Sequence, residues 1–198
     1  VVRIRSRGAG LSAADDCYIA LLRGVNVGGR SLPMAELREL VTGLGFGDVR
    51  TLLQSGNLLF RAAPQPPADL ERRLEAATAQ RFDTKPDYML RTPSEWSDVI
   101  AANPFPAETS ADPARVLVMF LAATPTAAAK KVFHALTPSP ERIALAGDAV
   151  FIHFPNGIAG SKFQSVHVEK ALKTPGTCRN WNSVLKVLAM AEALEAAG

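Results

Sequence analysis

The segment VRTLLQSGNLLFR (Val49–Arg61) contains two short apolar runs separated by the dipeptide Ser55-Gly56. Each run has the length of a β-strand, and a Ser-Gly pair is typical of a turn. Two strands that follow each other so closely are expected to pair as an antiparallel hairpin. We therefore predict strands at Val49–Gln54 and Asn57–Arg61, and the elements on either side of this hairpin indicate the topology.

A strand and a helix precede the hairpin, and a helix and a strand follow it. Tyr18–Arg23 (YIALLR) has the composition of a buried strand, and Pro33 suits the first turn of a helix that Gly45 would end, with Phe46 folding back onto it. After the hairpin, Asp69 begins a second helix and Asp87–Arg91 forms a fourth strand. The order β-α-β-β-α-β is the ferredoxin-like, or split βαβ, pattern.

This order predicts that two loops distant in sequence lie side by side. The strands Tyr18–Arg23 and Val49–Gln54 are joined through a helix, and a right-handed crossover makes them parallel. Their carboxyl ends then lie at the same edge of the sheet. The loop Gly24–Arg30 and the turn Gln54–Asn57 are therefore expected to be neighbours.

The second half of the chain follows the proline-rich segment Asn103–Pro113 and partly repeats the first. The patterns predict a strand at 115–122, a helix after Thr124-Pro125, a hairpin across Gly147-Asp148, and helices at 161–172 and 179–194. The prediction is an α+β fold with two ferredoxin-like halves, mostly antiparallel sheets with helices packed on them. The expected organisation is a flexible N-terminal leader at 1–16, a first half at 17–102, a linker at 103–113, and a second half at 114–198 with C-terminal helices.

Composition excludes several classes of protein. In 198 residues, 22 basic and 19 acidic side chains give a net charge of +3, too little by itself to indicate a nucleic-acid partner. Two distant cysteines without a CxxC motif favour a reducing compartment. The histidines lack zinc-ligand spacing, and the longest apolar run, Val116–Ala123, is far below the roughly 20 residues that span a bilayer. We expect a cytoplasmic protein with no metal, no cofactor and no membrane partner.

Three polar loops are the candidate ligand surface. In the first pair of neighbouring segments, Gly28-Gly29 precedes a helix N-terminus and Arg23 supplies charge, which suits a phosphate or a carboxylate; the alternative is a tight turn that merely needs glycine. Near Ser161-Lys162 an anion nest is possible, although Phe163 after the lysine excludes a P-loop; the alternative is a capped helix start at Ser161. In the third segment, Thr177 is predicted to cap the last helix, and Arg179 and Asn180 are expected to point outward or into a neighbouring loop.

Together these segments predict the following ligand-binding residues: Arg23, Asn26, Gly28, Gly29, Gln54, Ser55, Asn57, Ser161, Lys162, Arg179 and Asn180. The sequence does not identify a catalytic residue, with Glu36, Asp48 and His153 unranked among the possible bases, and it predicts no metal ligand. Cys178 is a weak candidate nucleophile because no histidine is placed beside it, and a buried inert thiol fits the pattern better.

Several of these segments carry a resemblance to a known family. The chain resembles the bacterial proteins grouped as domain of unknown function 1697 through the segments YIALLRGVNVGG (18–29), MAELRELVTGLGFGDVRTLLQSGNLLF (34–60), NPF (103–105), GSK (160–162) and TCRNWNSVLKV (177–187). The resemblance implies an α+β fold built of ferredoxin-like halves. It carries over no reaction, because the activity of the family is not established and a fold does not fix a function.

Three functions are therefore compared. The first is binding of a small anionic metabolite or nucleotide at the Gly-, Asn- and Arg-rich loops, with or without catalysis. The second is nucleic-acid binding, which is less favoured because the predicted strands lack the exposed aromatic residues of an RNA platform. The third is a non-catalytic interaction protein. The sequence does not indicate an oligomeric state.

Overall fold

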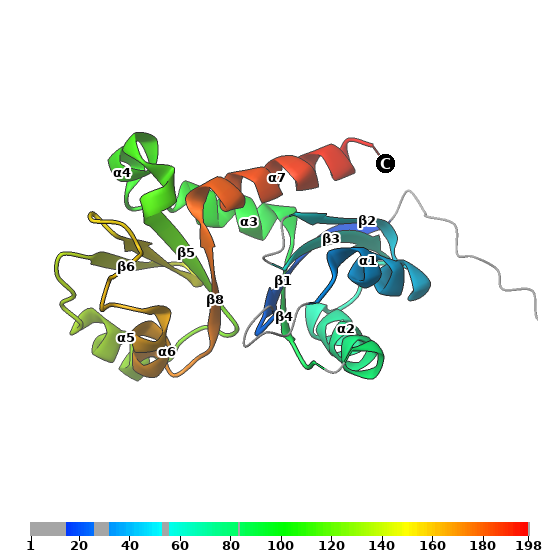
Figure 1. The fold of residues 1–198 in the computed structure, drawn as a ribbon, viewed down its shortest axis with the longest axis horizontal. Coiled ribbons are helices and arrows are strands. Elements are labelled where there is room, and N and C mark those ends of the chain that lie inside the picture. The colour runs from blue at the N-terminus through cyan, green and yellow to red at the C-terminus, as the bar shows by residue number, and fades with distance from the viewer. Residues whose placement is uncertain (1–14, 26–31, 53–55, 83, 198) are drawn as a thin grey trace, which may run out of the picture. The chain divides into compact units, whose positions relative to one another are not determined.

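The computed structural model describes residues 15–25, 32–52, 56–82 and 84–197, and the chain divides into two compact units (Figure 1). Unit 1 comprises Val1–Thr92 with Met190–Gly198, and unit 2 comprises Pro93–Ala189. Each unit contains one four-stranded antiparallel sheet. Every helix in the described ranges is too short or too polar to cross a membrane.

Unit 1 has the element order predicted from the sequence. Its elements are β1 (Asp16–Arg23), α1 (Met34–Gly43), β2 (Gly47–Leu52), β3 (Asn57–Ala62), α2 (Pro67–Arg81) and β4 (Asp87–Arg91). The strands are arranged in the order β2-β3-β1-β4, and α1 and α2 lie against the same face of the sheet (Figure 1). This arrangement is compatible with a ferredoxin-like half.

The carboxyl ends of β1 and β2 lie at one edge of this sheet, as the crossover argument predicted. Both strands pair antiparallel with β3, so they run parallel to each other. Asn57 at the start of β3 is opposite Leu21 on one side and Leu52 on the other. Just beyond, the Leu22 N–H donates to the Gly56 carbonyl at 2.9 Å, which holds the end of β1 against the turn.

Apolar side chains at alternate strand positions build the core of unit 1. Tyr18, Ala20 and Leu22 of β1 belong to the cluster that the helices cover. Gly45 ends α1 with a φ of +86°, a conformation that glycine adopts without steric cost. Phe46 then folds back and stacks on Phe60 with ring centroids 4.8 Å apart, which confirms the predicted helix stop.

Two acidic side chains of α2 close the outer edge of β4. The Leu90 N–H donates to Glu71 Oε1 at 2.8 Å, and the Tyr88 N–H donates to Glu75 Oε1 at 3.1 Å. Burial raises the pKa of Glu71 above its ordinary value, and its hydrogen bond from the backbone opposes that rise. These carboxylates satisfy backbone donors that an edge strand would otherwise present to another chain.

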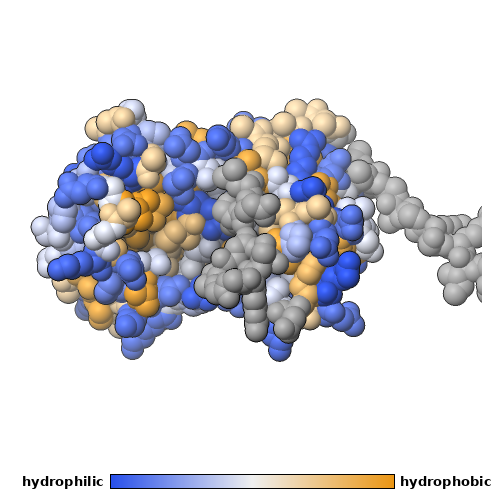
Figure 2. Space-filling model, viewed as in Figure 1, coloured by the Kyte–Doolittle hydropathy of each residue, from blue (hydrophilic) through white to orange (hydrophobic). Residues whose placement is uncertain are grey.

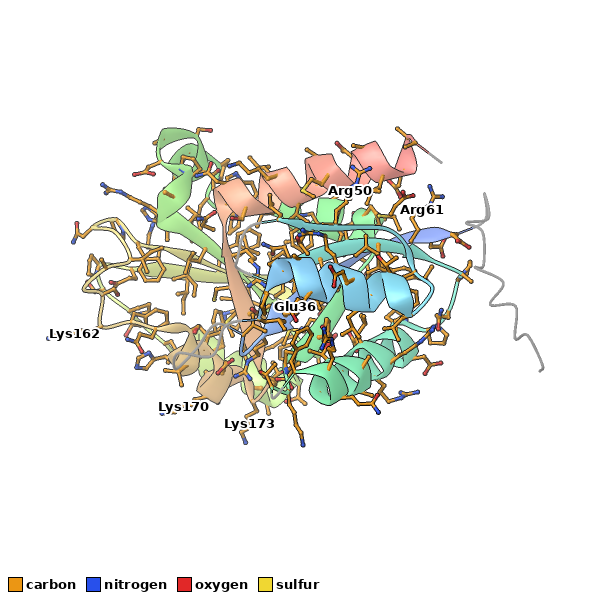
Figure 3. The ribbon with its side chains drawn as sticks, turned by 45° about the vertical axis from the view of Figure 1, so that its right-hand side comes forward. Glu36, Arg50, Arg61, Lys162, Lys170 and Lys173 are labelled. Carbon is orange, nitrogen blue, oxygen red and sulfur yellow. The ribbon has the colours of Figure 1, made fainter. Side chains whose placement is uncertain are left out.

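Arg61 of β3, labelled in Figure 3, connects the sheet of unit 1 to the carboxyl end of helix α7 (Trp181–Glu195). This side chain is buried, and it donates from Nη2 to the Asp15 carbonyl at 2.9 Å and from Nη1 to the Leu194 carbonyl at 3.4 Å. A guanidinium at the carboxyl end of a helix is favourable because the helix dipole is negative there.

Unit 2 contains a second sheet with the same strand order as the first. Its elements are α3 (Pro93–Ala101), α4 (Pro106–Ala111), the 3-10 turn η1 (Pro113–Arg115), β5 (Val116–Leu121), α5 (Ala127–His134), β6 (Arg142–Ala146), β7 (Ala149–His153), α6 (Ser165–Leu172), β8 (Gly176–Asn180) and most of α7 (Trp181–Glu195). The sheet order β6-β7-β5-β8 corresponds strand by strand to that of unit 1.

The sequence prediction missed β8. We predicted that a helix capped by Thr177 would start near Arg179, but Gly176–Asn180 pairs with β5, with Cys178 opposite Met119. The helix begins only at Trp181, after Asn180. The error arises because Trp181 and the apolar residues after it have helical spacing that extends smoothly back to Thr177, a good cap residue. The second half is thus β-α-β-β-α-β flanked by further helices.

The boundaries within the second half also differ from the prediction. The division between the units falls after Thr92, and residues 103–113, predicted as a linker, lie inside unit 2 and contain α4 and the first residue of η1. Proline is well tolerated in the first turn of a helix, and Pro106 and Pro113 each occupy such a position. Helix α6 starts at Ser165 rather than Ser161, with Gln164 as its N-cap. Residues 1–14 of the predicted leader lie outside the described residues.

Unit 2 packs side chains on both faces of its sheet. Helices α5 and α6 cover one face, where Met119, Ile152 and Phe133 belong to the core cluster. On the opposite face Phe120 stacks on Trp96 of α3, with ring centroids 4.3 Å apart. The Trp96 indole N–H donates to the Val184 carbonyl at 3.0 Å, which joins α3 to α7.

On the described residues visible in Figure 2, hydrophobic side chains form separate patches among hydrophilic ones. The large hydrophobic side chains that are exposed in the described ranges are Val132, Ile158, Val166 and Leu185. They come from α5, the loop before α6, α6 and α7.

A glycine in β8 is required by close packing and gives a test of the missed strand. An added Cβ at Gly176 would lie 2.9 Å from the Phe120 carbonyl oxygen on β5. We expect Gly176→Ala to lower the free energy of unfolding by about 1–3 kcal/mol, measured by urea denaturation. Gly43→Ala is the matched control, because no atom lies within 4 Å of a Cβ there, and it should leave stability unchanged or slightly raised. Equal stability of both variants would contradict this packing.

Candidate functional site

A surface hollow of about 270 Å³ in unit 2 contains two of the predicted binding residues. It lies between the residues that lead into β6 and the loop that follows β7. Its lining residues are Ser139, Pro140, Glu141, Asn156, Gly157, Ala159, Gly160, Ser161 and Lys162. A second hollow of about 210 Å³ adjoins it, sharing Ser139, Glu141 and Lys162, and is completed by Pro138, Phe163 and His167.

The loop from Asn156 to Lys162 takes its shape from two glycines. Gly157 and Gly160 have φ values of +86° and +85°, in the region that disfavours residues with a side chain. The Gly157 N–H donates to the Phe154 carbonyl at 3.0 Å, and the Ser161 N–H donates to the Ile158 carbonyl at 3.2 Å. These two turns bring Ser161 back toward the start of β6.

Ser161 connects this loop to Glu141. Its Oγ donates to Glu141 Oε1 at 2.5 Å and accepts a hydrogen bond from the Phe163 N–H at 3.1 Å. Glu141 is only 8% exposed although it lines both hollows. The hydroxyl of Ser161 therefore fixes the position of a buried carboxylate and is not itself a free anion donor.

Lys162 supplies the positive charge of the hollow. Its side chain is exposed and extends away from the ribbon in Figure 3. Among the described residues Lys162 forms no ion pair. An unpaired ammonium at the rim of a concave surface can bind an anionic group.

An aromatic pair forms the far wall of the second hollow. The rings of Phe163 and His167 stack with centroids 5.4 Å apart and an interplanar angle of 18°. His167 Nδ1 lies 3.0 Å from the Gln164 backbone nitrogen and 3.1 Å from the Gln164 carbonyl oxygen. In the tautomer in which Nδ1 accepts from the Gln164 N–H, Nε2 carries a proton that can be donated to a ligand.

The other described candidates of the predicted set lie outside the two hollows and make contacts within the fold. Arg23 at the end of β1 pairs with Asp87, Nη1 to Oδ2, at 3.2 Å on the surface. Asn57 is fully buried and donates from Nδ2 to the Leu52 carbonyl at 3.1 Å, across the turn between β2 and β3. Asn26, Gly28, Gly29, Gln54 and Ser55 lie outside the described residues.

Arg179 and Asn180 do not line the hollows, and Arg179 does not take the outward orientation that was one of the two expected for it. Arg179 is buried in β8, where its Nη1 donates to Thr177 Oγ1 and to the Cys178 carbonyl, each at 2.8 Å. Burial lowers the pKa of Arg179 to about 10. Asn180 accepts a hydrogen bond on Oδ1 from the Ser183 N–H at 2.8 Å, and it is therefore the N-cap of α7.

The two thiols are poor nucleophiles. Burial raises the pKa of both Cys17 and Cys178 to about 11, so each is a neutral thiol near pH 7. The described residues contain no group of three or more histidine, cysteine, aspartate or glutamate side chains placed to hold a metal ion.

Sequence reasoning missed Glu141. A single acidic residue between Pro140 and Arg142 has no signal of its own, and its importance comes from the twenty-residue separation that the fold closes between it and Ser161. The burial of Glu141 beside the loop Asn156–Lys162 follows from the fold and leaves no pattern in the sequence.

Comparisons with known proteins define the class to which this fold belongs. A family model described as Protein of unknown function (DUF1697) matches residues 16–151. The chain belongs to this family. Among solved structures, it is similar to that of the conserved bacterial protein SP0830 from Streptococcus pneumoniae, with 26% identity and a TM-score of 0.65, covering 90% of this chain and 99% of that chain. A comparison with curated proteins found no match.

The assignment of Asn180 as a helix cap can be tested by substitution. Asn180→Ala removes the acceptor for the Ser183 N–H and should lower the free energy of unfolding by about 1 kcal/mol, measured by urea denaturation. Asn180→Asp keeps an acceptor and should retain most of the stability. If Asn180→Ala were as stable as the unsubstituted protein, the cap would contribute nothing and a role in binding would regain support.

Proposed function

We propose that this is a cytoplasmic protein that binds a small molecule carrying a phosphate or carboxylate group in the paired hollows of unit 2. Lys162 binds the anionic group, and the loop Asn156–Lys162 surrounds it. The observation that carries the proposal is an exposed lysine, with no ion pair to any described residue, on the wall of a hollow lined by a glycine-rich loop.

The dimensions and chemistry of the site support a small ligand. Each hollow lies a little below the range of roughly 300–1,000 Å³ typical of small-molecule sites, and the two adjoin. Polar groups converge there, including Asn156 and His167, while the Phe163 ring offers an apolar surface. A convergent set of few polar groups beside an apolar wall is the usual composition of a binding site.

The test is a thermal-shift screen against phosphorylated and carboxylated metabolites, followed by calorimetry. A ligand that binds only the native state raises the melting temperature. Lys162→Gln should weaken the binding of such a ligand at least about tenfold, because a charge-assisted hydrogen bond contributes about 1.5–3 kcal/mol.

Lys186→Gln provides the matched control for that variant. Lys186 is an exposed lysine of α7 in the same unit, and it lines neither hollow. Its substitution should leave the affinity within about twofold, since a surface charge outside the site is largely screened by salt. Unchanged affinity in Lys162→Gln would refute the assigned site.

Nucleic-acid binding is a second candidate because basic side chains gather on the helices of unit 2. Helix α5 carries Lys130 and Lys131, helix α6 carries Lys170, and Lys173 follows it, with Lys170 and Lys173 extending from the ribbon in Figure 3. The acidic residues Glu95, Asp98, Glu108 and Asp112 belong to α3, α4 and the residue after α4. Helix α6 also carries Glu169, so the four lysines on and directly after α5 and α6 outnumber the single acidic side chain of these two helices.

A filter-binding assay over a range of salt concentrations decides between the two functions. If nucleic acid binds, retention of RNA or DNA should fall steeply with salt, and the Lys170→Gln/Lys173→Gln double variant should reduce the slope by about 2. The Lys85→Gln/Lys186→Gln double variant removes the same charge from exposed lysines outside α5 and α6, and it should leave the slope nearly unchanged. Salt-independent or absent retention eliminates this second candidate.

A further inference from the structure

We infer that the ligand of this hollow is zwitterionic: it carries a primary ammonium group that binds Glu141 in addition to the anionic group that binds Lys162. The inference rests on the proposed function for the anionic end alone. Its own basis is the state of Glu141, which the anion-binding proposal neither needs nor explains.

Glu141 is a buried carboxylate without a cationic partner in the described part of the chain. Only 8% of the surface of this residue is exposed. No described lysine, arginine or histidine nitrogen lies within 4.0 Å of its carboxylate. The adjacent Arg142 is occupied elsewhere, because it pairs with Glu108 and lies over the Phe105 ring.

A carboxylate removed from water is costly unless a cation or several hydrogen-bond donors compensate it. Ser161 gives one hydrogen bond from a neutral hydroxyl to Oε1. That bond orients the carboxylate but does not balance its charge. An ammonium group entering the hollow would supply the missing charge and three further donors.

The carboxylate is also held ready for such a ligand. The Ser161 hydroxyl that binds Oε1 is itself fixed by the Phe163 N–H, so the serine cannot turn away without breaking a backbone contact. A carboxylate fixed through one oxygen can accept from a ligand at its second oxygen. Preorganisation of this kind reduces the entropic cost of binding.

The placement of the two charges selects the class of ligand. Glu141 and Lys162 line both hollows, so a negative and a positive group share one concave surface. A ligand with only an anionic group would meet repulsion from Glu141, whereas a compact molecule with an ammonium at one end and an anion at the other satisfies both. Amino acids and aminoalkyl phosphates share this chemistry.

The experiment compares ligands in pairs that differ only in the amino group. The probes are phosphoethanolamine against ethyl phosphate, and γ-aminobutyrate against butyrate, each titrated into the full chain by calorimetry. In at least one pair the amino-bearing member should bind about tenfold or more tightly than its partner. The pair in which this occurs identifies phosphate or carboxylate as the anionic end.

Glu141→Gln is the decisive variant. Glutamine keeps the shape of the side chain and an acceptor for Ser161, so the loop is retained while the charge is lost. The amino-bearing probe should lose its tenfold advantage, and the amino-free probe should bind equally or better. A carboxylate that merely anchors the loop would leave the ratio of the two affinities unchanged, and that result would overturn the inference.

Two further results separate the inference from the function on which it rests. If the amino-free probe binds the unsubstituted protein as tightly as its partner, and Lys162→Gln weakens both, the zwitterionic ligand is refuted and the anion site stands. If Lys162→Gln changes neither affinity, the anion site is refuted. If no probe binds, the inference fails, and the anion site is decided by the wider metabolite screen.

Should Glu141→Gln unfold, Ser161→Ala replaces it. This variant leaves the charge of Glu141 in place but removes the hydrogen bond that orients it, so it should reduce the advantage of the amino-bearing probe only in part. No change in that advantage would count against a positioned carboxylate.

Discussion

The antiparallel pairing of the two central strands is the interaction on which each unit depends. In unit 1 it joins β1 to β3, and in unit 2 it joins β5 to β7. Every residue of β3 is buried, and nearly every residue of β5 and β7 is as well. In each unit the two outer strands pair with this central pair, and two helices (α1 and α2, or α5 and α6) cover one face of the sheet. The same four-stranded arrangement therefore arises twice from sequences with no evident residue-level repeat.

Sequence patterns predicted those elements whose local chemistry and tertiary role agree. The hairpin across Gly147-Asp148 and the stop of α1 at Gly45 were predicted because a two-residue turn and a left-handed cap each leave a local signal. Strand β8 was missed because its pairing with β5 is non-local, while its residues Thr177 to Asn180 look locally like the entry to a helix. Tertiary pairing overrides local preference in short polar strands.

Sequence patterns predicted only one part of the candidate site, the glycine-rich loop, and missed the carboxylate opposite it. The glycine-rich loop before α6 drew attention to Ser161 and Lys162, but Glu141 stands in an unremarkable stretch and becomes significant only when the fold buries it beside Ser161. The same limit applies to Asn57 and Asn180, whose polarity suggested ligand binding. Both side-chain amides form hydrogen bonds with backbone groups at a strand end or a helix end. A polar side chain in a loop can have this role as readily as it can bind a ligand.

The two glutamates of α2 also determine where that helix can lie along its own axis. Glu71 and Glu75 are one turn apart, a spacing of about 6 Å along a helix, and the amides of Leu90 and Tyr88 are about 6.6–6.8 Å apart along a strand. The spacing of the two carboxylates along the helix therefore nearly equals the spacing of the two amides along the strand, so both hydrogen bonds can form at the same time. An axial shift of α2 by about half of that spacing would carry both carboxylates away from their amide donors, so the two bonds together favour one axial position of α2 against β4.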